Sequence, residues 1–430
     1  MRIFQTRLLQ ALTALSSAVW FAPDSLAQTS RLHASVHELK KLSLEELLNL
    51  EVVSVSRKRE RAAAVAAAVH VITEEDIRRS GSRSIPEALR LAPNLQVAQS
   101  SSRNWAISAR GFNASFSNKL LVLMDGRSVY TPLYSGVFWD AQDTLLEDLD
   151  RIEVISGPGA TVWGANAVNG VINVITKSAR ETHGLLLTGG GGDEERAFAG
   201  VRYGGRAGPD LHFRVYAKAF ERDDVTTMSG TDERDGWQHA QGGFRVDWEP
   251  GFDDVLTVQG DLYDGRGEQG ARADIEHSGG NLLARWTRRF SENEEFRIQT
   301  YYDRTERLVP SDFGDELDTL DVDAQYGRDV GERHHVIVGA GYRFTRNRVQ
   351  NLSSAVFLPP ILNRRLYSAF IQDEISFSDP RLKMALGAKF EHNDYTGFEI
   401  QPGWRASWST GDHAFWAAVS RAVRTPSRFD

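Results

Sequence analysis

Side chains that could carry out catalysis are common in this chain, but no motif brings them together as a reactive set. Serine, histidine and aspartate residues occur throughout, yet no spacing places a nucleophile beside a base and an orienting group. A glycine-rich run at residues 189–192 lacks the lysine and the strand-to-helix context of a phosphate-binding loop. There is no cysteine, which excludes thiolate chemistry. We therefore expect a protein that is not an enzyme.

The histidines and the net charge also exclude two kinds of partner. No metal-ligand spacing is found among the histidines at His33, His37, His277, His334 and His335. The adjacent pair His334-His335 lies in a predicted strand, where neighbouring side chains point to opposite faces. We expect no metal site and no cofactor. The formal net charge of −8 argues against nucleic acid as a partner, because nucleic-acid binding calls for a clustered basic face.

The N-terminus carries the features of an export signal. Arg2 and Arg7 precede an apolar stretch at residues 8–22, and small residues follow up to Ala27. This pattern predicts a signal peptide at residues 1–27; an uncleaved anchor is the alternative. No later run reaches the roughly 18 apolar residues that a membrane helix needs. Any membrane that the exported chain occupies must therefore be crossed by strands.

Residues 61–178 mix helix and strand signals. Thr73 is a natural cap for a short helix that ends near Gly81, and Ser84 begins a second helix that Pro93 terminates. A short apolar run at residues 120–124 ends in the turn signal Asp125-Gly126. Two further strands are predicted at residues 151–155 and 171–175, with a tight turn at residues 169–170. This pattern predicts a compact α+β domain.

From about residue 183 onward, segments of about ten residues alternate apolar and polar side chains. At residues 211–221, for example, alternate positions are apolar, and the positions between them are polar or aromatic. Alternation alone fits a soluble β-sandwich. Segments of about 9–11 residues, long enough for a tilted crossing, favour a membrane barrel instead, as do aromatic residues near the segment ends. The long linkers at residues 223–238 and 347–363 suit external loops.

Several motifs resemble those of TonB-dependent outer-membrane receptors. The most specific block reads DRIEVISGPG at residues 150–159, WGANA at 163–167 and NGVINVITK at 169–177. Supporting motifs are IPEAL at 85–89, RGF at 110–112 and LMDGR at 123–127. The resemblance extends over residues 42–430.

The resemblance implies an α+β plug domain at residues 61–178, followed by an antiparallel transmembrane β-barrel from residue 183 to residue 430. Barrels of such transporters have about 22 strands, and we count about 12–13 here. An open sheet edge in lipid would leave backbone groups unpaired. We therefore expect a fragment or a truncated product, which does not transport as it stands. We also expect a monomer in contact with outer-membrane lipid.

The resemblance also implies functional residues near the N-terminus of the plug. Within the periplasmic segment 28–60, the extended and β-branched residues are expected to pair by β-addition with TonB, whose inner-membrane complex supplies energy. These residues are Glu51, Val52, Val53, Ser54, Val55 and Ser56. The alternative is that they pair as a strand of the plug itself. Arg110, Arg151 and Glu153 are expected to form ion pairs with barrel residues that face the lumen. The alternative is that they form plain surface ion pairs.

The expected function is uptake of a scarce solute across the outer membrane of a Gram-negative cell. Such receptors carry a ferric siderophore, cobalamin or a similar small-molecule chelate, and the plug apices hold the ligand. The expected ligand residues are Arg103, Trp105, Tyr130, Tyr134 and Trp139. The alternative is a surface receptor for binding or signalling that does not transport.

Overall fold

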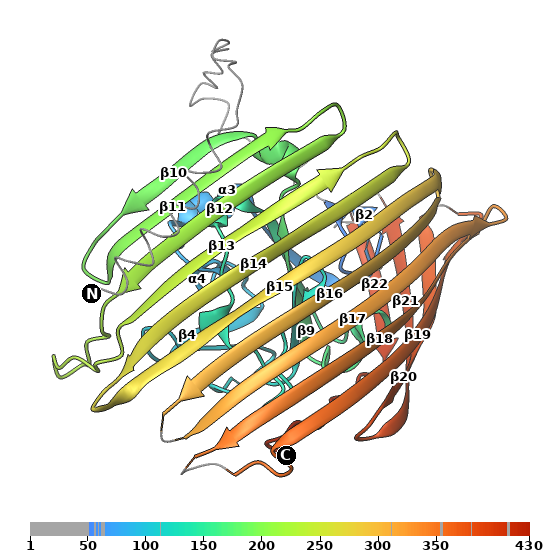
Figure 1. Ribbon diagram of the computed structural model, residues 1–430. Helices are drawn as coiled ribbons and strands as arrows, with labels where there is room; N and C mark the ends of the chain where they lie inside the picture. Colours follow the sequence, from blue (N-terminus) through green and yellow to red (C-terminus); the bar gives the residue numbers. More distant parts are fainter. Residues whose placement is uncertain are drawn as a thin grey trace.

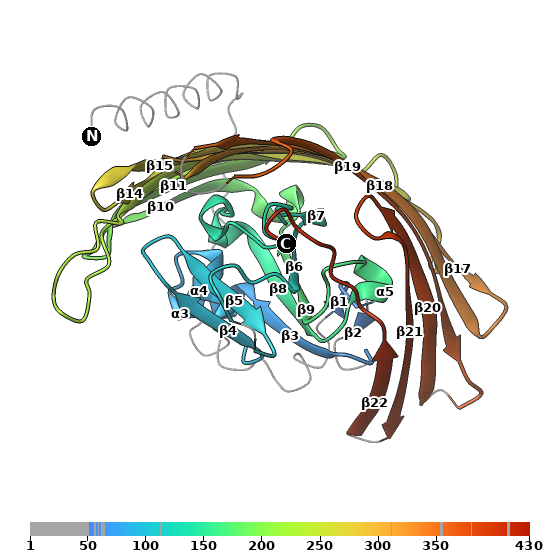
Figure 2. The same cartoon turned by 90° about the horizontal axis from the view of Figure 1, so that it is seen from below.

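The chain folds into a small α+β domain and one wide sheet that curves around it (Figures 1 and 2). The computed structural model describes residues 51–55, 57–58, 60–61, 65–111, 113–310, 312–352, 356–379, 381–410 and 413–430. The predicted signal peptide and Ser56 lie outside these residues.

The small domain is built on a five-stranded sheet with the strand order β3-β8-β9-β6-β7. Only the β6–β9 pair is parallel. Two short hairpins, β1–β2 and β4–β5, stand beside this sheet. The strands are β1 (Glu51–Val52), β2 (Glu60–Arg61), β3 (Ala68–Thr73), β4 (Leu95–Gln99), β5 (Trp105–Ala109), β6 (Leu120–Met124), β7 (Arg127–Ser128), β8 (Leu149–Ser156) and β9 (Gly170–Thr176). The helices are α3 (Glu74–Ser80), α4 (Ile85–Leu89), η4 (Trp139–Ala141), η5 (Leu146–Asp148), α5 (Ala160–Trp163) and η6 (Ala179–Thr182).

Local signals in the sequence predicted both helix starts and the end of α3 correctly, but α4 ends at Leu89, before the predicted stop at Pro93. Thr73 caps α3 in a capping box with Asp76, and Gly81 ends the helix in the left-handed region at φ 70°. Ser84 accepts a hydrogen bond from the Glu87 N–H and caps α4. No described helix is long and apolar enough to cross a membrane.

The turn predictions were partly wrong. The hairpin turn Asp125-Gly126 is confirmed, with φ values of 50° and 85° between β6 and β7. The predicted turn at residues 169–170 does not form, because Gly170 is the first residue of β9 and has no positive φ. No side chain fits at Gly170, because a Cβ there would lie 2.4 Å from the Ile155 carbonyl oxygen.

The core of the small domain lies on one face of the five-stranded sheet. Ile72, Leu149, Ile152 and Ile172 are fully buried there against α3 and α4. A second, smaller cluster on the opposite face contains Val52, Val55, Leu121, Ile155 and Val171. Because successive side chains of β8 point to opposite faces, the strand contributes apolar side chains to both clusters.

The large sheet is antiparallel throughout and contains 13 strands joined in sequence order. Its two edge strands, β10 and β22, stand apart in Figure 2, so the described sheet is open. The strands are β10 (Gly184–Gly190), β11 (Glu195–Arg206), β12 (Leu211–Arg222), β13 (Trp237–Trp248), β14 (Asp254–Gln269), β15 (Arg272–Ser291), β16 (Glu294–Val309), β17 (Phe313–Val330), β18 (His334–Asn351), β19 (Ile361–Ser376), β20 (Leu382–Asn393), β21 (Gly397–Thr410) and β22 (His413–Ser420).

The strand number agrees with the prediction, but many strands are longer than expected. The longest, β15, has 20 residues. The strands extend beyond the alternating segments, so the loops are shorter than predicted. The connection after β18, for example, spans residues 352–360 and not the predicted 347–363.

The connections of the sheet define its two ends. We call the end with residues 223–236 and 352–360 the loop end, and the end with the turns 207–210, 249–253, 292–293, 331–333 and 377–381 the short-turn end. After β22, residues 421–430 return across the concave side at the loop end (Figure 2).

The two faces of the large sheet differ in polarity as the alternation predicted. In β12, His212, Arg214 and Tyr216 are buried on the concave side, against the small domain. Exposed large apolar side chains occur along the sheet at Leu187, Tyr203, Phe244, Trp248, Leu262, Leu282, Trp286, Leu320, Val338, Ile371, Leu386 and Trp404. A polar concave face and an apolar convex face are what a barrel wall in lipid requires.

Gly164 offers a test of how closely the small domain fits the wall. Its φ of 88° and ψ of −157° suit only glycine, and a Cβ would lie 2.1 Å from Glu391 Oε1. Glu391 accepts hydrogen bonds from Ala165 N (2.9 Å) and Gln401 Nε2 (2.6 Å). We expect Gly164→Ala to lower the free energy of unfolding by about 3 kcal/mol, measured by guanidinium unfolding in detergent.

Gly81→Ala is the matched control, because Gly81 also has a positive φ but a Cβ there meets nothing within 4 Å. Its cost should be only about 1 kcal/mol. Equal effects of the two substitutions would contradict the close fit at Glu391.

Candidate functional site: contacts between the small domain and the wall

Segment 51–55 is packed against the small domain. β1 pairs with β2 in antiparallel register, Glu51 opposite Arg61. Val52 and Val55 are buried in the second apolar cluster with Leu121 and Ile155. In this structure, residues 51–52 therefore pair within the small domain, as the alternative to pairing with TonB expects.

A single buried carboxylate holds the backbone of this segment. Glu153 has no exposed surface and accepts hydrogen bonds from the N–H groups of Val53 (3.1 Å) and Ser54 (2.9 Å). Arg151 Nε also donates to it at 2.8 Å. Charge-assisted hydrogen bonds of this kind are required to keep a carboxylate out of water.

Further donors bind the carbonyl groups and the side chain of the segment. Trp163 Nε1 donates to Ser54 O at 2.6 Å, and Asn173 Nδ2 donates to Ser54 Oγ at 2.9 Å. From the wall, Arg405 Nη1 donates to Val55 O at 2.8 Å. Because its backbone groups are engaged in this way, the segment cannot add to a partner sheet before it is released.

The residues just after the segment attach it to the wall. Arg57 Nη1 lies 2.8 Å from Asp323 Oδ1 in β17, and the Arg57 side chain is only 6% exposed. The same guanidinium lies 4.7 Å from the Trp163 ring and 4.9 Å from the Phe370 ring. Lys58 pairs with Glu374 in β19. These wall residues lie in the strand halves that lead to the short-turn end.

The predicted wall ion pairs of Arg110, Arg151 and Glu153 are corrected by the structure. Arg151 pairs with Asp150 and with Glu153, all within the small domain. Arg110 is exposed, with φ 56°, and its guanidinium lies over Gly157. The physical reason is position: segment 51–55 is docked over Glu153 on this face of β8, and the carboxylates that Arg151 meets lie on β8 itself.

Other side chains make the ion pairs to the wall among the described residues. These include Arg57–Asp323, Lys58–Glu374, Glu87–Arg222, Arg127–Asp303, Asp140–Arg307, Asp143–Lys218, Asp148–Arg202 and Asp148–Arg214. Basic residues at alternate positions of the predicted strands indicated that the wall would present cations on one face. The sequence does not indicate which carboxylate of the small domain pairs with each of them.

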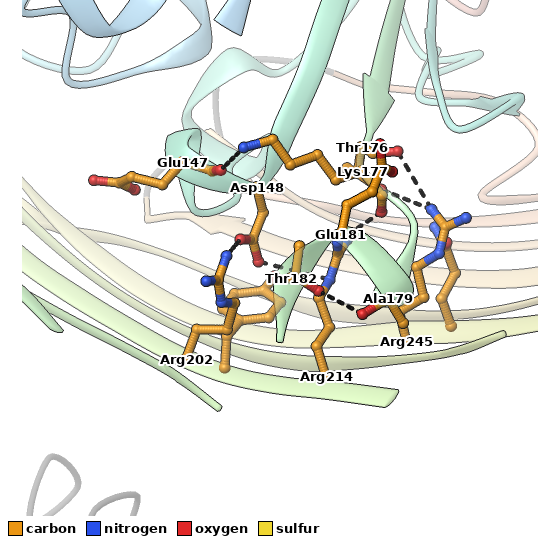
Figure 3. A network of polar contacts seen from close by, with 12 residues as sticks. Glu147, Asp148, Thr176, Lys177, Ala179, Glu181, Thr182, Arg202, Arg214 and Arg245 are labelled. Atoms are coloured by element: carbon orange, nitrogen blue, oxygen red, sulfur yellow. Dashed lines mark hydrogen bonds and ion pairs between the residues drawn. The ribbon is translucent and has the colours of Figure 1, made fainter. Parts of the chain in front are cut away.

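Figure 3 shows one such network around Asp148, which is 1% exposed. Arg202 Nη1 lies 2.5 Å from Asp148 Oδ1, and Arg214 Nε lies 3.6 Å from Oδ2. Arg214 also donates to Lys177 O at 2.7 Å, and Arg245 donates to Thr176 Oγ1 at 3.0 Å. The network fixes the point at which the chain passes from the small domain into the wall.

The five predicted ligand residues occupy different environments near the loop end. Arg103 is buried and donates to Asp235 O (3.3 Å) and Glu268 O (2.7 Å) of the wall. Trp105 packs in the core of the small domain, whereas Tyr134 is buried among aromatic rings where this domain meets Val349 and Phe357 of the wall. Trp139 packs against the core in η4. Of the five, Tyr130 lines the large cavity described next.

A cavity of about 1540 Å³ separates one side of the small domain from the wall. Tyr130, Tyr395 and Thr425 line it toward the loop end, and Glu249 and Lys383 line it toward the short-turn end. Among the described residues, no group of three His, Cys, Asp or Glu side chains is placed to hold a metal ion.

Comparison with known proteins agrees with this architecture. The family model "TonB-dependent Receptor Plug Domain" matches residues 61–171, and "TonB dependent receptor-like, beta-barrel" matches residues 181–430. The chain belongs to the TonB-dependent receptor family. This is a family of outer-membrane receptors and transporters and not of enzymes. The small domain is its plug, and the 13-stranded sheet is part of its barrel wall.

Relatives share the fold but are longer than the matched region. The vitamin B12 transporter BtuB of Vibrio vulnificus is 34% identical over 145 residues, which are 33% of this chain and 23% of that protein. The siderophore receptor PirA from Pseudomonas aeruginosa aligns with a TM-score of 0.64 at 20% identity, covering 84% of this chain and 66% of PirA. FpvA of P. aeruginosa, in a complex with an iron-bound pyoverdine, aligns with a TM-score of 0.70 at 13% identity, covering 87% and 59%. The solved structures agree with the fold, and none of these likenesses identifies the solute.

The Asp140–Arg307 pair holds the plug to the wall near the loop end. Arg307 Nη1 lies 2.9 Å from Asp140 Oδ2, and the two side chains are 9% and 3% exposed. Burial alone would raise the pKa of the Asp140 carboxyl, but the Arg307 guanidinium outweighs it and lowers the pKa to about 2. Asp140 therefore stabilises the fold above the ordinary carboxyl pKa and loses this effect as the pH falls through about 2.

We expect Asp140→Asn to lower the free energy of unfolding at pH 7 by about 3–5 kcal/mol, because Arg307 stays buried without its counter-charge. The difference from the unsubstituted chain should be constant between about pH 7 and pH 5 and shrink below about pH 4. Guanidinium unfolding at each pH, followed by tryptophan fluorescence, measures both effects.

Asp379→Asn is the control for this test. Its hydrogen bond with Arg381 lowers the pKa of Asp379 to about 2 as well, but the pair is solvated in the turn 377–381. Its substitution should change stability little at any pH. A pH-independent effect of Asp140→Asn would contradict the role of the charge.

Proposed function

We propose that this chain acts in an outer-membrane receptor that takes up a scarce solute, such as a ferric siderophore, cobalamin or a similar chelate. The plug gates the lumen, and TonB supplies the work. The observation that carries this proposal is the docking of segment 51–55, whose backbone is held by Glu153 of the plug and by Arg405 of the wall.

External energy is required because the outer membrane itself maintains no source of work for uphill uptake. A partner that binds by β-addition uses backbone N–H and C=O groups as its main points of attachment. In the docked state these groups at Val53, Ser54 and Val55 are engaged. Release of the segment therefore exposes a pairing edge, and this release is the step that gating controls.

The ligand side of the proposal rests on the loop end of the plug. The loop before β5 meets the wall there through Arg103, and η4 meets it through Asp140. The cavity begins beside Tyr130 and continues to the short-turn end, where TonB would act. A solute bound at the loop end and a partner bound to segment 51–56 would thus contact opposite ends of one rigid domain.

The docked state can be tested by thiol labelling, because the chain has no native cysteine. Ser54 is 1% exposed, so a maleimide should react slowly with Ser54→Cys. Adding Glu153→Gln removes the charge that holds two N–H groups of the segment and should speed labelling by about tenfold or more. Glu75→Gln, in the exposed helix α3, is the control and should leave the rate unchanged. Fast labelling without Glu153→Gln would contradict the docked state.

The TonB interaction can be tested by co-purification with the periplasmic domain of TonB. Val53→Pro with Val55→Pro removes two backbone donors, so binding should be lost. Val53→Ala with Val55→Ala keeps both donors and should retain most of the binding. If the proline variant binds as well as the alanine variant, the segment is not the attachment site.

A further inference from the structure

A pair of histidines is buried where the plug meets the wall near the loop end. His239 in β13 and His277 in β15 are both register partners of Gly265 in the strand between them. Because Gly265 has no side chain, the two imidazoles meet over it, and His239 Nδ1 lies 3.3 Å from His277 Nε2. The two residues are 1% and 3% exposed, so the pair is held out of water.

The hydrogen bonds around the pair determine which nitrogen is free to take up a proton. Gln241 Nε2 donates to Asp143 O at 3.0 Å, and Gln241 Oε1 lies 3.4 Å from His239 Nε2. An amide oxygen only accepts, so neutral His239 donates from Nε2 and accepts at Nδ1 from His277 Nε2. His277 Nδ1 is then the nitrogen without a proton. Among the described residues it has no hydrogen-bond partner.

The charged groups that face the pair are already bound to other groups. They are Arg103, Asp140 and Asp143 of the plug and Lys218 and Arg307 of the wall, and Tyr263 of β14 is a further titratable neighbour. Asp140 is paired with Arg307, and Asp143 lies 2.7 Å from Lys218. Arg103 donates to the carbonyl groups of Asp235 and Glu268. In this part of the described chain, no free carboxylate is therefore placed to balance a proton on His277.

The contacts that hold the plug apex to the wall surround the same pair. Ser102 N donates to Asp235 Oδ2 at 2.6 Å, and Trp237 Nε1 donates to Ser102 O at 3.1 Å. The Trp237 ring lies 6.0 Å from the His239 ring and 6.3 Å from the His277 ring. Ser102 is itself only 3% exposed, and neither histidine lines the large cavity. Water therefore reaches the imidazoles only when this part of the plug moves away from the wall.

We propose that His239 and His277 form an acid-sensitive latch that holds the plug apex, residues 102–103, to the wall. The latch is closed while both imidazoles are neutral. A proton on His277 Nδ1 would be buried beside Arg103 without an acceptor, so a proton is taken up only in an open state in which water solvates the rings. This inference goes beyond the proposed function, because it depends neither on the solute nor on TonB.

The latch can be tested by maleimide labelling of Ser102→Cys in the full chain, which has no native cysteine, purified in detergent. Rates at pH 5 and pH 7.5 are divided by those of Ser291→Cys, an exposed position at the short-turn end, to remove the pH dependence of the thiol itself. A histidine that is neutral in the closed state and has the ordinary pKa of about 6.5 in the open state favours opening about thirtyfold more at pH 5 than at pH 7.5. The normalised rate should therefore rise by about thirtyfold or more.

His239→Gln with His277→Gln, made in the Ser102→Cys chain, removes both titrating groups and keeps polar side chains at both positions. The rise should then fall below about threefold. His334→Gln is the matched control, because this partly exposed histidine of β18 pairs with Asp373 away from the plug. It should leave the rise unchanged.

Ser108→Cys separates a local opening from a general loosening of the plug, because Ser108 lies in β5 and is 3% exposed. Its normalised rate should be the same at both pH values. An equal rise at Ser108→Cys overturns the latch, as does a flat profile at Ser102→Cys. A rise that persists without the two histidines also overturns it. Asp140 cannot account for the expected rise, because its pKa of about 2 keeps it ionised at both pH values.

Discussion

A carboxylate removed from water must be supplied with donors, and the arrangement of the plug follows from how Glu153 obtains them. Its donors are the side chain of Arg151 and the backbone of Val53 and Ser54, so the most buried charge of the domain is satisfied only while segment 51–55 is docked. The same requirement recurs farther out at Asp148 and Asp140, whose donors come from the wall. The hydrogen bonds and ion pairs of these buried carboxylates thus hold segment 51–55, the plug and the large sheet together.

Features set by neighbouring residues could be predicted from the sequence. Thr73 and Gly81 bound α3 because a hydroxyl cap and a left-handed residue act within one turn. The turn Asp125-Gly126 and the polar concave face of β12 follow from local rules in the same way. The sheet of 13 strands was predictable for this reason, since each strand pairs with its neighbour in the sequence.

Contacts between distant segments could not be predicted. Arg151 was expected to reach the wall, but its partners Asp150 and Glu153 lie on the same strand, and segment 51–55 is docked over Glu153. Trp105 and Tyr134 are aromatic residues of the kind expected at a ligand site, yet Trp105 packs in the core of the plug and Tyr134 is buried between plug and wall. The pairing of Arg57 with Asp323 depends on the register of β17 against the plug, and no local pattern encodes that register.

The five-stranded sheet of the plug connects Tyr130, which lines the cavity, with Glu153, which holds segment 51–55. Tyr130 lies two residues after β7, β7 pairs with β6, β6 pairs with β9, and β9 pairs with β8, which carries Glu153. Three successive strand pairings therefore connect the segment after β7 to the carboxylate that binds segment 51–55. Asp125, at the β6–β7 turn, accepts from Thr176 at the end of β9 and from Gln259 of the wall, so this route is also braced from outside. A movement of this sheet relative to the wall would have to break the hydrogen bond between Gln259 and Asp125 and the ion pair between Arg127 and Asp303.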